Sequence, residues 1–254
     1  MKITLELIDA IRPSTYNPRS AVPERLDLIE LSLSKLGFIA PIFADTDGEI
    51  LSGHQRHLVA ERMGATHLPV FRTKALDLDQ RKALNIVFNR ATNDFDFHHT
   101  PGKVTAELES LDIQALADRI PDKEVGGDGF LRCLKPAEVP VKDLCRANAG
   151  RWIQYARNLA RTLHRHGILM PIVCREDLTV INGIGRLEML AEKKVVNAPV
   201  VFVTDDEAEF ARAMMNLLSM DFDIHTRYAD MLRFNSFRRA RRVRRELGNG
   251  FIFA

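Results

Sequence analysis

The chain has 254 residues, 46% of them hydrophobic and 28% charged, which is the composition of a globular protein with room for two ordinary domains. No apolar run approaches the roughly 18 residues that a membrane helix needs, and the N-terminus lacks a secretory signal. Three cysteines without C-x-x-C spacing indicate neither a disulfide framework nor a zinc site, so we expect a cytoplasmic protein.

The first half of the sequence predicts short strands that alternate with helices. In chain order the expected elements are a strand over 3–8, a helix over 22–37, a hairpin over 39–52, a helix over 53–64, a strand over 67–73 and a helix over 76–91. Pro23 suits the first turn of the first helix, and Gly37 suits its C-terminal end.

The second half predicts the same order of elements. They are a helix over 148–167, strands over 169–175 and 178–182, a helix that opens at Gly183, a strand over 196–204 and a helix over 206–220. A glycine-rich, charged stretch at 121–130 marks the join. We therefore place a first domain at 1–122, a linker at 123–136, a second domain at 137–226 and a basic helical tail at 227–254.

An internal repeat underlies this likeness, and repeats of this kind decide the fold. One constant shift along the sequence aligns turn residues of the two halves, namely Gly37 with Gly167, Pro41 with Pro171, Gly53 with Gly183, Arg56 with Arg186 and Pro69 with Pro199. A slightly smaller shift then aligns the D-F-D-x-H motifs at 94–98 and 221–225. Because glycine and proline mark positions of restricted backbone geometry, so many matches in register indicate a duplication.

The turn at Gly53 has the features of a phosphate site. A helix that opens at a glycine directly after a strand presents free backbone N–H groups and the positive end of its dipole. Arg56, one turn further on, could add a guanidinium contact, and His54 and Gln55 could bind a phosphate or transfer a proton. The alternative is a well-packed turn whose arginine pairs with a nearby carboxylate.

Three stretches together resemble the ParB/sulfiredoxin superfamily, in particular its ParB-like nuclease domains. They are STYNPR (14–19), LSLSKLGFIAPI (31–42) and ILSGHQRHLVAERMGATHLPV (50–70). The resemblance covers residues 3–92 well and 139–220 weakly, and G-H-x-R also resembles the archaeal free-serine kinase. It implies an α+β fold of two tandem small mixed-sheet domains with a helical basic C-terminal segment, and binding of CTP, ATP or ADP. The phosphate ligands that it implies are Arg19, Gly53, His54, Gln55 and Arg56.

The sequence also departs from the family. The E-N-x-x-R box of ParB clamps keeps only its asparagine, at Asn89 and Asn216, and no helix-turn-helix follows. His54 stands where sulfiredoxin has its catalytic cysteine. The second copy keeps Gly183 and Arg186 as counterparts of the first turn but has no clear counterpart of Arg19. We therefore expect one copy with full chemistry and one degraded partner copy.

Two further motifs have alternative readings. The aspartates and histidine of D-F-D-x-H suit a metal such as Mn²⁺ or Mg²⁺, but they also suit a helix cap with a phenylalanine anchor, and the metal ligands stay unknown.

The tail carries eight arginines between residues 227 and 247, against only Asp230 and Glu246. Four of them share one helical face and predict non-specific contact with DNA phosphates, namely Arg238, Arg241, Arg242 and Arg245. A solvated or docked terminal helix is the alternative.

The combined expectation is a ParB-like nucleotide-binding protein in a DNA-associated process, prokaryotic or encoded by a phage. It would use ATP or CTP with Mg²⁺ for phosphoryl or phosphodiester chemistry, with His54 as the candidate acid or base. A kinase acting on a small molecule or a nucleic-acid modification, and a non-catalytic DNA-binding or adaptor protein, are the alternatives. No membrane partner is expected, and a homodimer is left open.

Overall fold

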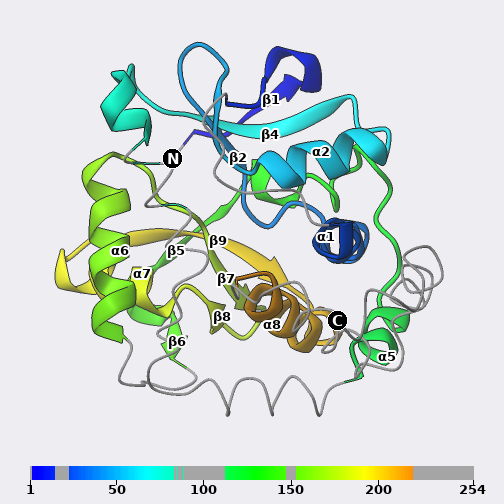
Figure 1. The fold of residues 1–254 in the computed structure, drawn as a ribbon. Helices are drawn as coiled ribbons and strands as arrows, with labels where there is room; N and C mark the ends of the chain where they lie inside the picture. The colour runs from blue at the N-terminus through cyan, green and yellow to red at the C-terminus, as the bar shows by residue number, and fades with distance from the viewer. Residues whose placement is uncertain are drawn as a thin grey trace, which may run out of the picture.

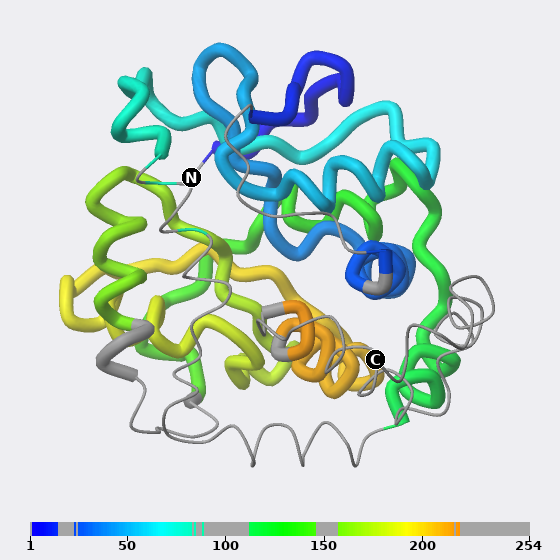
Figure 2. The backbone as a smooth tube through the Cα atoms, in the orientation of Figure 1, coloured from blue at the N-terminus to red at the C-terminus, as the bar shows by residue number. Residues whose placement is uncertain are grey.

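The computed structural model describes residues 2–14, 23–82, 84, 88, 112–146 and 153–219. In this part of the chain two mixed sheets lie one above the other in the view of Figure 1, with helices beside and between them. Figure 2 traces the same path as a tube, with the strands and helices of residues 4–72 above those from residue 137 onward. The predicted α+β class with small mixed sheets is confirmed. None of the helices described is long and apolar enough to cross a membrane.

The first sheet has the strand order β1-β4-β2-β3. Its strands are β1 (Thr4–Leu7), β2 (Ile42–Ala44), β3 (Ile50–Ser52) and β4 (His67–Arg72), and its helices are α1 (Pro23–Leu36) and α2 (His54–Arg62). Strand β4 pairs antiparallel with β1 and parallel with β2, and β2 forms the predicted hairpin with β3. A further helical stretch begins at residue 78.

The second sheet has the order β5-β9-β7-β8-β6. Its strands are β5 (Ala137–Pro140), β6 (Cys145–Arg146), β7 (Ile172–Arg175), β8 (Thr179–Asn182) and β9 (Asn197–Val203). The helices are α5 (Ile113–Asp118), α6 (Ile153–Arg165), α7 (Ile184–Glu192) and α8 (Asp205–Ser219), and short 3₁₀ turns cover Ile8–Ala10, Arg132–Leu134 and Val141–Asp143. The sequence did not predict strands β5 and β6, because each is short and β5 ends in a proline.

The two sheets share topology and register. The pair Ile42–Val70 between β2 and β4 has its counterpart in the pair Ile172–Val200 between β7 and β9, at the same shift that aligns the turn residues. An irregularity between the second and third residues of β2 recurs at the same point of β7. This likeness is what a duplication would produce, and the duplication itself stays a prediction.

The two halves pack into each other. Leu28 and Leu36 of α1 share one core cluster with Phe210 and Met214 of α8. In turn, Leu163 of α6 lies in a cluster with Phe43, Phe71 and Phe88 of the first half. In each case the first helix of one half contacts the last helical stretch of the other, so core clusters shared between the halves join them.

The stretch expected as a linker, 123–136, is packed against both halves. Phe130 and Cys133 are fully buried in the core of the first sheet. Lys123 and Arg132 form ion pairs of 2.7 and 2.8 Å with Glu207 of α8, whose side chain is 3% exposed. The stretch therefore ties the first sheet to α8, while the exact domain boundaries stay a prediction.

Candidate functional site

The turn at Gly53 joins β3 to α2. Gly53 has φ +104°, in the left-handed region that favours glycine, and its carbonyl accepts the first helical hydrogen bond, from the N–H of His57 at 2.8 Å. No side chain caps this helix end and no acidic residue stands in its first turn. Because the first N–H groups of a helix have no partner within it, this end of α2 favours an anion.

Glycine is required here for space as well as for conformation. A Cβ at Gly53 would lie 2.7 Å from Cδ1 of Ile42 and 3.1 Å from Nη2 of Arg56. The Arg56 guanidinium therefore folds back against the glycine, and its Nη1 donates a hydrogen bond to the carbonyl oxygen of Ala40. Burial lowers the pKa of Arg56 to about 10, so the side chain stays charged near neutral pH.

The second copy repeats this arrangement. Gly183 has φ +105°, and a Cβ there would lie 2.7 Å from Nη2 of Arg186. Arg186 donates to Oδ1 of Asn182 at 2.8 Å, and burial lowers its pKa to about 10. Ile184 packs on the core of this half and Gly185 is buried, so the first turn of α7 has no polar side chains equivalent to His54 and Gln55.

His54 connects the turn to the start of the STYNPR stretch. A parallel bridge between Arg12 and Glu49 lays residues 12–14 beside the hairpin, and the N–H of Ser14 donates to Nε2 of His54 at 3.2 Å. A ring nitrogen that accepts this bond carries no proton, so the neutral ring holds its proton on Nδ1. The site thus joins α2 to the segment that leads to Arg19.

Comparison with known proteins shows what one part of this chain resembles. A curated relative, the ParB-like nuclease domain-containing protein YnaK of Escherichia coli K12, is 27% identical over 82 residues, which are 32% of this chain and 94% of the relative. Over this stretch the chain is similar to a ParB-like nuclease domain. No family model matches the chain.

Two solved structures show weaker likeness to the ParB-like chain. A C-terminally truncated ParB of Caulobacter crescentus, complexed with CTP-γ-S, is 22% identical with a TM-score of 0.33, and the match covers 47% of this chain and 64% of that one, just under two-thirds of its length. A Pnob8-like ParB-N domain is 13% identical with a TM-score of 0.30, over 99% of this chain and 82% of that one.

The structure describes only part of the predicted site. Gly53, His54, Gln55 and Arg56 form one turn, as the sequence predicts. Arg19, the D-F-D-x-H motifs and the tail arginines lie outside the described residues. In the described ranges no group of three or more histidines, cysteines, aspartates or glutamates is arranged to hold a metal ion.

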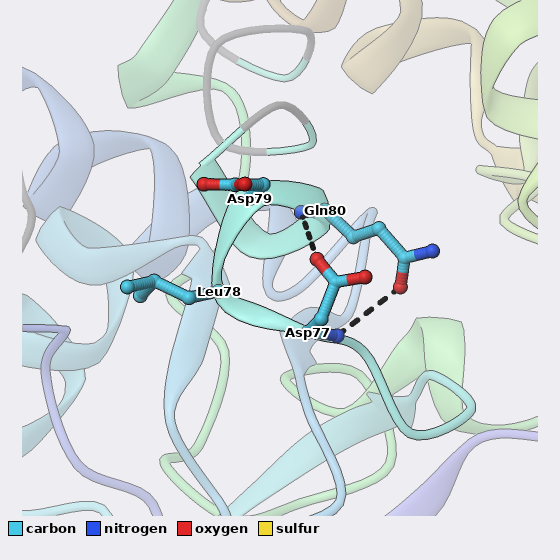
Figure 3. Close-up of a pocket in the computed structure, with 4 residues that line it drawn as sticks. All are labelled: Asp77, Leu78, Asp79 and Gln80. Carbon is cyan, nitrogen blue, oxygen red and sulfur yellow. Dashed lines mark hydrogen bonds between the residues drawn. The ribbon is translucent and has the colours of Figure 1, made fainter.

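A shallow pocket lies elsewhere on the ParB-like chain and does not suit an anion. Asp77, Leu78, Asp79 and Gln80 line it at the start of the helical stretch after β4 (Figure 3). The N–H of Asp77 donates to Oε1 of Gln80 at 3.1 Å, and the N–H of Gln80 donates to Oδ1 of Asp77 at 2.8 Å. These reciprocal bonds are a helix cap, and two carboxylates would repel phosphate.

Sequence reasoning missed the residues that hold Arg56. Ala40 follows closely on Phe38, whose N–H donates to the carbonyl of Phe130 at 2.6 Å and whose carbonyl accepts from the N–H of Cys133 at 3.0 Å. Burial raises the pKa of the Cys133 thiol to about 12, so this neighbour of Arg56 is neutral. No local pattern reveals the part played by Phe130 and Cys133, because both lie far from the turn in the sequence.

Proposed function

We propose that this ParB-like protein binds a nucleotide at the Gly53 turn and acts in a DNA-associated process. The observation that carries the proposal is the start of α2, which opens at a glycine, has no side-chain cap and no acid in its first turn, and is backed by the charged Arg56. Phosphate groups are the anions that such helix ends bind most readily. The family resemblance favours CTP or ATP, with Mg²⁺ as the accompanying ion.

The chemistry that follows binding is proposed from the same residues. Arg19 would reach the phosphates from the STYNPR stretch, and a divalent ion would neutralise their charge. His54 stays the candidate acid or base, with Nδ1 as the protonated nitrogen of its neutral ring. Phosphoryl transfer and phosphodiester cleavage are both reactions to assay, and the name of the curated relative favours including the second.

Contact with DNA is proposed for the arginine-rich tail. Arg238, Arg241, Arg242 and Arg245 would bind phosphates without reading bases. The affinity for unrelated DNA duplexes should then be similar and should fall steeply as salt increases.

Calorimetry of ATP, CTP, GTP and ADP with Mg²⁺ tests the nucleotide site. The informative variant is Gln55→Glu, because an acid in the first turn suits the helix dipole but repels a bound phosphate. We expect its affinity to be at least about tenfold weaker. Gln80→Glu makes the same change of charge in the first turn of another helix and should leave binding unchanged.

The outcomes separate the candidate functions. A wild-type protein that binds none of the four nucleotides would overturn the proposal. If binding is found, release of free phosphate, transfer of phosphate to an acceptor and cleavage of DNA are then assayed separately. Binding without any turnover would favour the adaptor alternative.

A further inference from the structure

Arg56 differs from the arginines that brace the fold elsewhere in the chain. Arg72 pairs with Glu6 at 2.6 Å, and Arg132 pairs with Glu207 at 2.8 Å. In the described ranges Arg56 forms no ion pair, and its hydrogen bond goes to the neutral carbonyl of Ala40. A partly buried cation is normally matched by a carboxylate, so Arg56 holds a charge that this part of the fold leaves uncompensated.

The guanidinium lies on the inner side of the turn. Nη2 of Arg56 and Cδ1 of Ile42 approach the same point, the position that a Cβ of Gly53 would occupy. Ile42 is completely buried in the core of the first sheet. The positive charge therefore sits behind the N-terminus of α2, on the side of the glycine that faces the core.

The equivalent arginine of the second half differs in its acceptor, although a neutral side-chain amide oxygen compensates its charge no more than the Ala40 carbonyl does. Arg186 has the side-chain oxygen of Asn182 as its acceptor at 2.8 Å, and Ser52 stands at the equivalent position of the first copy. The first copy keeps the guanidinium without this acceptor. Among the described residues, the copy that retains the polar first turn of His54 and Gln55 is thus the one whose arginine is left without a side-chain partner.

We propose that Arg56 is a positioning residue of the anion site: it fixes the turn through Ala40 and supplies an uncompensated positive charge from behind, without contacting phosphate. This inference rests on the proposed nucleotide site. The helix end and the guanidinium add their fields at the mouth of the turn, and a bound anion supplies the negative charge that the fold lacks. The charge is stored for the ligand at the expense of stability in the free protein.

A loss of nucleotide affinity without a loss of stability distinguishes this role from a purely structural one. Arg56→Met keeps an unbranched, flexible side chain, shorter than that of arginine, and removes its charge. We expect the unfolding midpoint of the ligand-free protein to change little, since the loss of the hydrogen bond to Ala40 and the removal of a partly buried charge without a carboxylate partner have opposite effects on stability. Nucleotide affinity should fall at least about tenfold. If Arg56 only stabilised the fold, its replacement would lower the unfolding midpoint. Arg62→Met, at the exposed end of the same helix, is the matched control for the loss of one positive charge.

Arg56→Lys separates positioning by charge from direct contact with phosphate. A lysine keeps the charge and loses the planar fork, so we expect affinity within a few-fold of wild type. A lysine variant that folds as wild type but binds as weakly as Arg56→Met would show that the fork holds phosphate, and would overturn the inference. Full affinity in Arg56→Met would also overturn it. Failure of the proposed function is distinct, because wild-type protein itself would then bind no nucleotide.

Discussion

Glu207 should be the carboxylate on which acid stability depends most. It lies buried at the start of α8 and accepts hydrogen bonds of 2.8 and 2.9 Å from Arg132, with Lys123 at 2.7 Å. Its Oε2 also accepts from the N–H of Thr204 at 3.1 Å. Glu207→Gln would remove the charge and leave two cations facing each other across the join between the halves.

The magnitude follows from the pKa of this group. Burial alone would raise the pKa of Glu207, but the hydrogen bonds from Arg132 and Lys123 outweigh it and lower the pKa from 4.5 to about 2. At about 1.4 kcal/mol for each pKa unit, the folded state gains roughly 3 kcal/mol from the charged form. Because the folded pKa lies below the unfolded one, this gain is complete above about pH 5 and is lost as the pH falls from 4.5 toward 2.

Denaturant unfolding of wild type and Glu207→Gln, at several values between pH 7 and pH 3, measures this gain. We expect the variant to be about 3 kcal/mol less stable at pH 7, with a difference that shrinks as the pH falls. Glu209, exposed on the same helix, is the matched control, and Glu209→Gln should change stability by less than about 0.5 kcal/mol. A difference that stays constant over this pH range would refute the reasoning.

Three further predictions concern the turns and the thiols. Gly53→Ala should lower the free energy of unfolding by more than about 2 kcal/mol, because φ is +104° and a Cβ would meet a buried isoleucine at 2.7 Å. Gly64→Ala, where a Cβ would have no neighbour within 4 Å, should lower it by only about 1 kcal/mol, and denaturant unfolding of both variants checks the difference. Lys194→Gly should raise the free energy of unfolding by roughly 0.5–1 kcal/mol, since Lys194 has φ +55°, and an unchanged unfolding midpoint would contradict this. In the native protein near pH 8 a thiol reagent should modify the exposed Cys145 long before the buried Cys133 and Cys174, because burial raises the pKa of both buried thiols to about 12. Mass spectrometry of the modified peptides would show the order of modification.

The sequence predicted the parts of the fold that short-range rules control. Gly37, Gly53 and Gly183 all have positive φ, at the helix ends where the sequence placed them. The shift found by matching turn residues is also the shift that relates the strand register of the two sheets. Periodicity and turn chemistry act over a few residues, so they are readable without tertiary structure.

The contacts between distant segments could not be predicted in the same way. The stretch 123–136 is charged and rich in glycine, which is typical of a linker, yet its Phe130 fills the core and its Arg132 pairs with a residue 75 positions further on. The spacing of Gly53 and Arg56 predicts that the arginine lies one turn along the helix. It does not predict in which direction the guanidinium points. Such choices depend on tertiary packing, which overrides local preference.

The positions at which the two copies differ separate geometry from chemistry. Left-handed backbone occurs at Gly64, where a Cβ would meet nothing within 4 Å, and again at its equivalent, Lys194, so glycine is dispensable where conformation alone is required. At the turn glycine both halves have glycine, because the arginine three residues later occupies the space of a Cβ. The G-x-x-R pattern is thus explained by packing, and its presence alone does not identify a binding site. The proposed chemistry then depends on what the first half has and the second lacks in the described part of the chain. These features are the polar first turn of α2, its bond to Ser14 and an arginine whose acceptor is a backbone carbonyl.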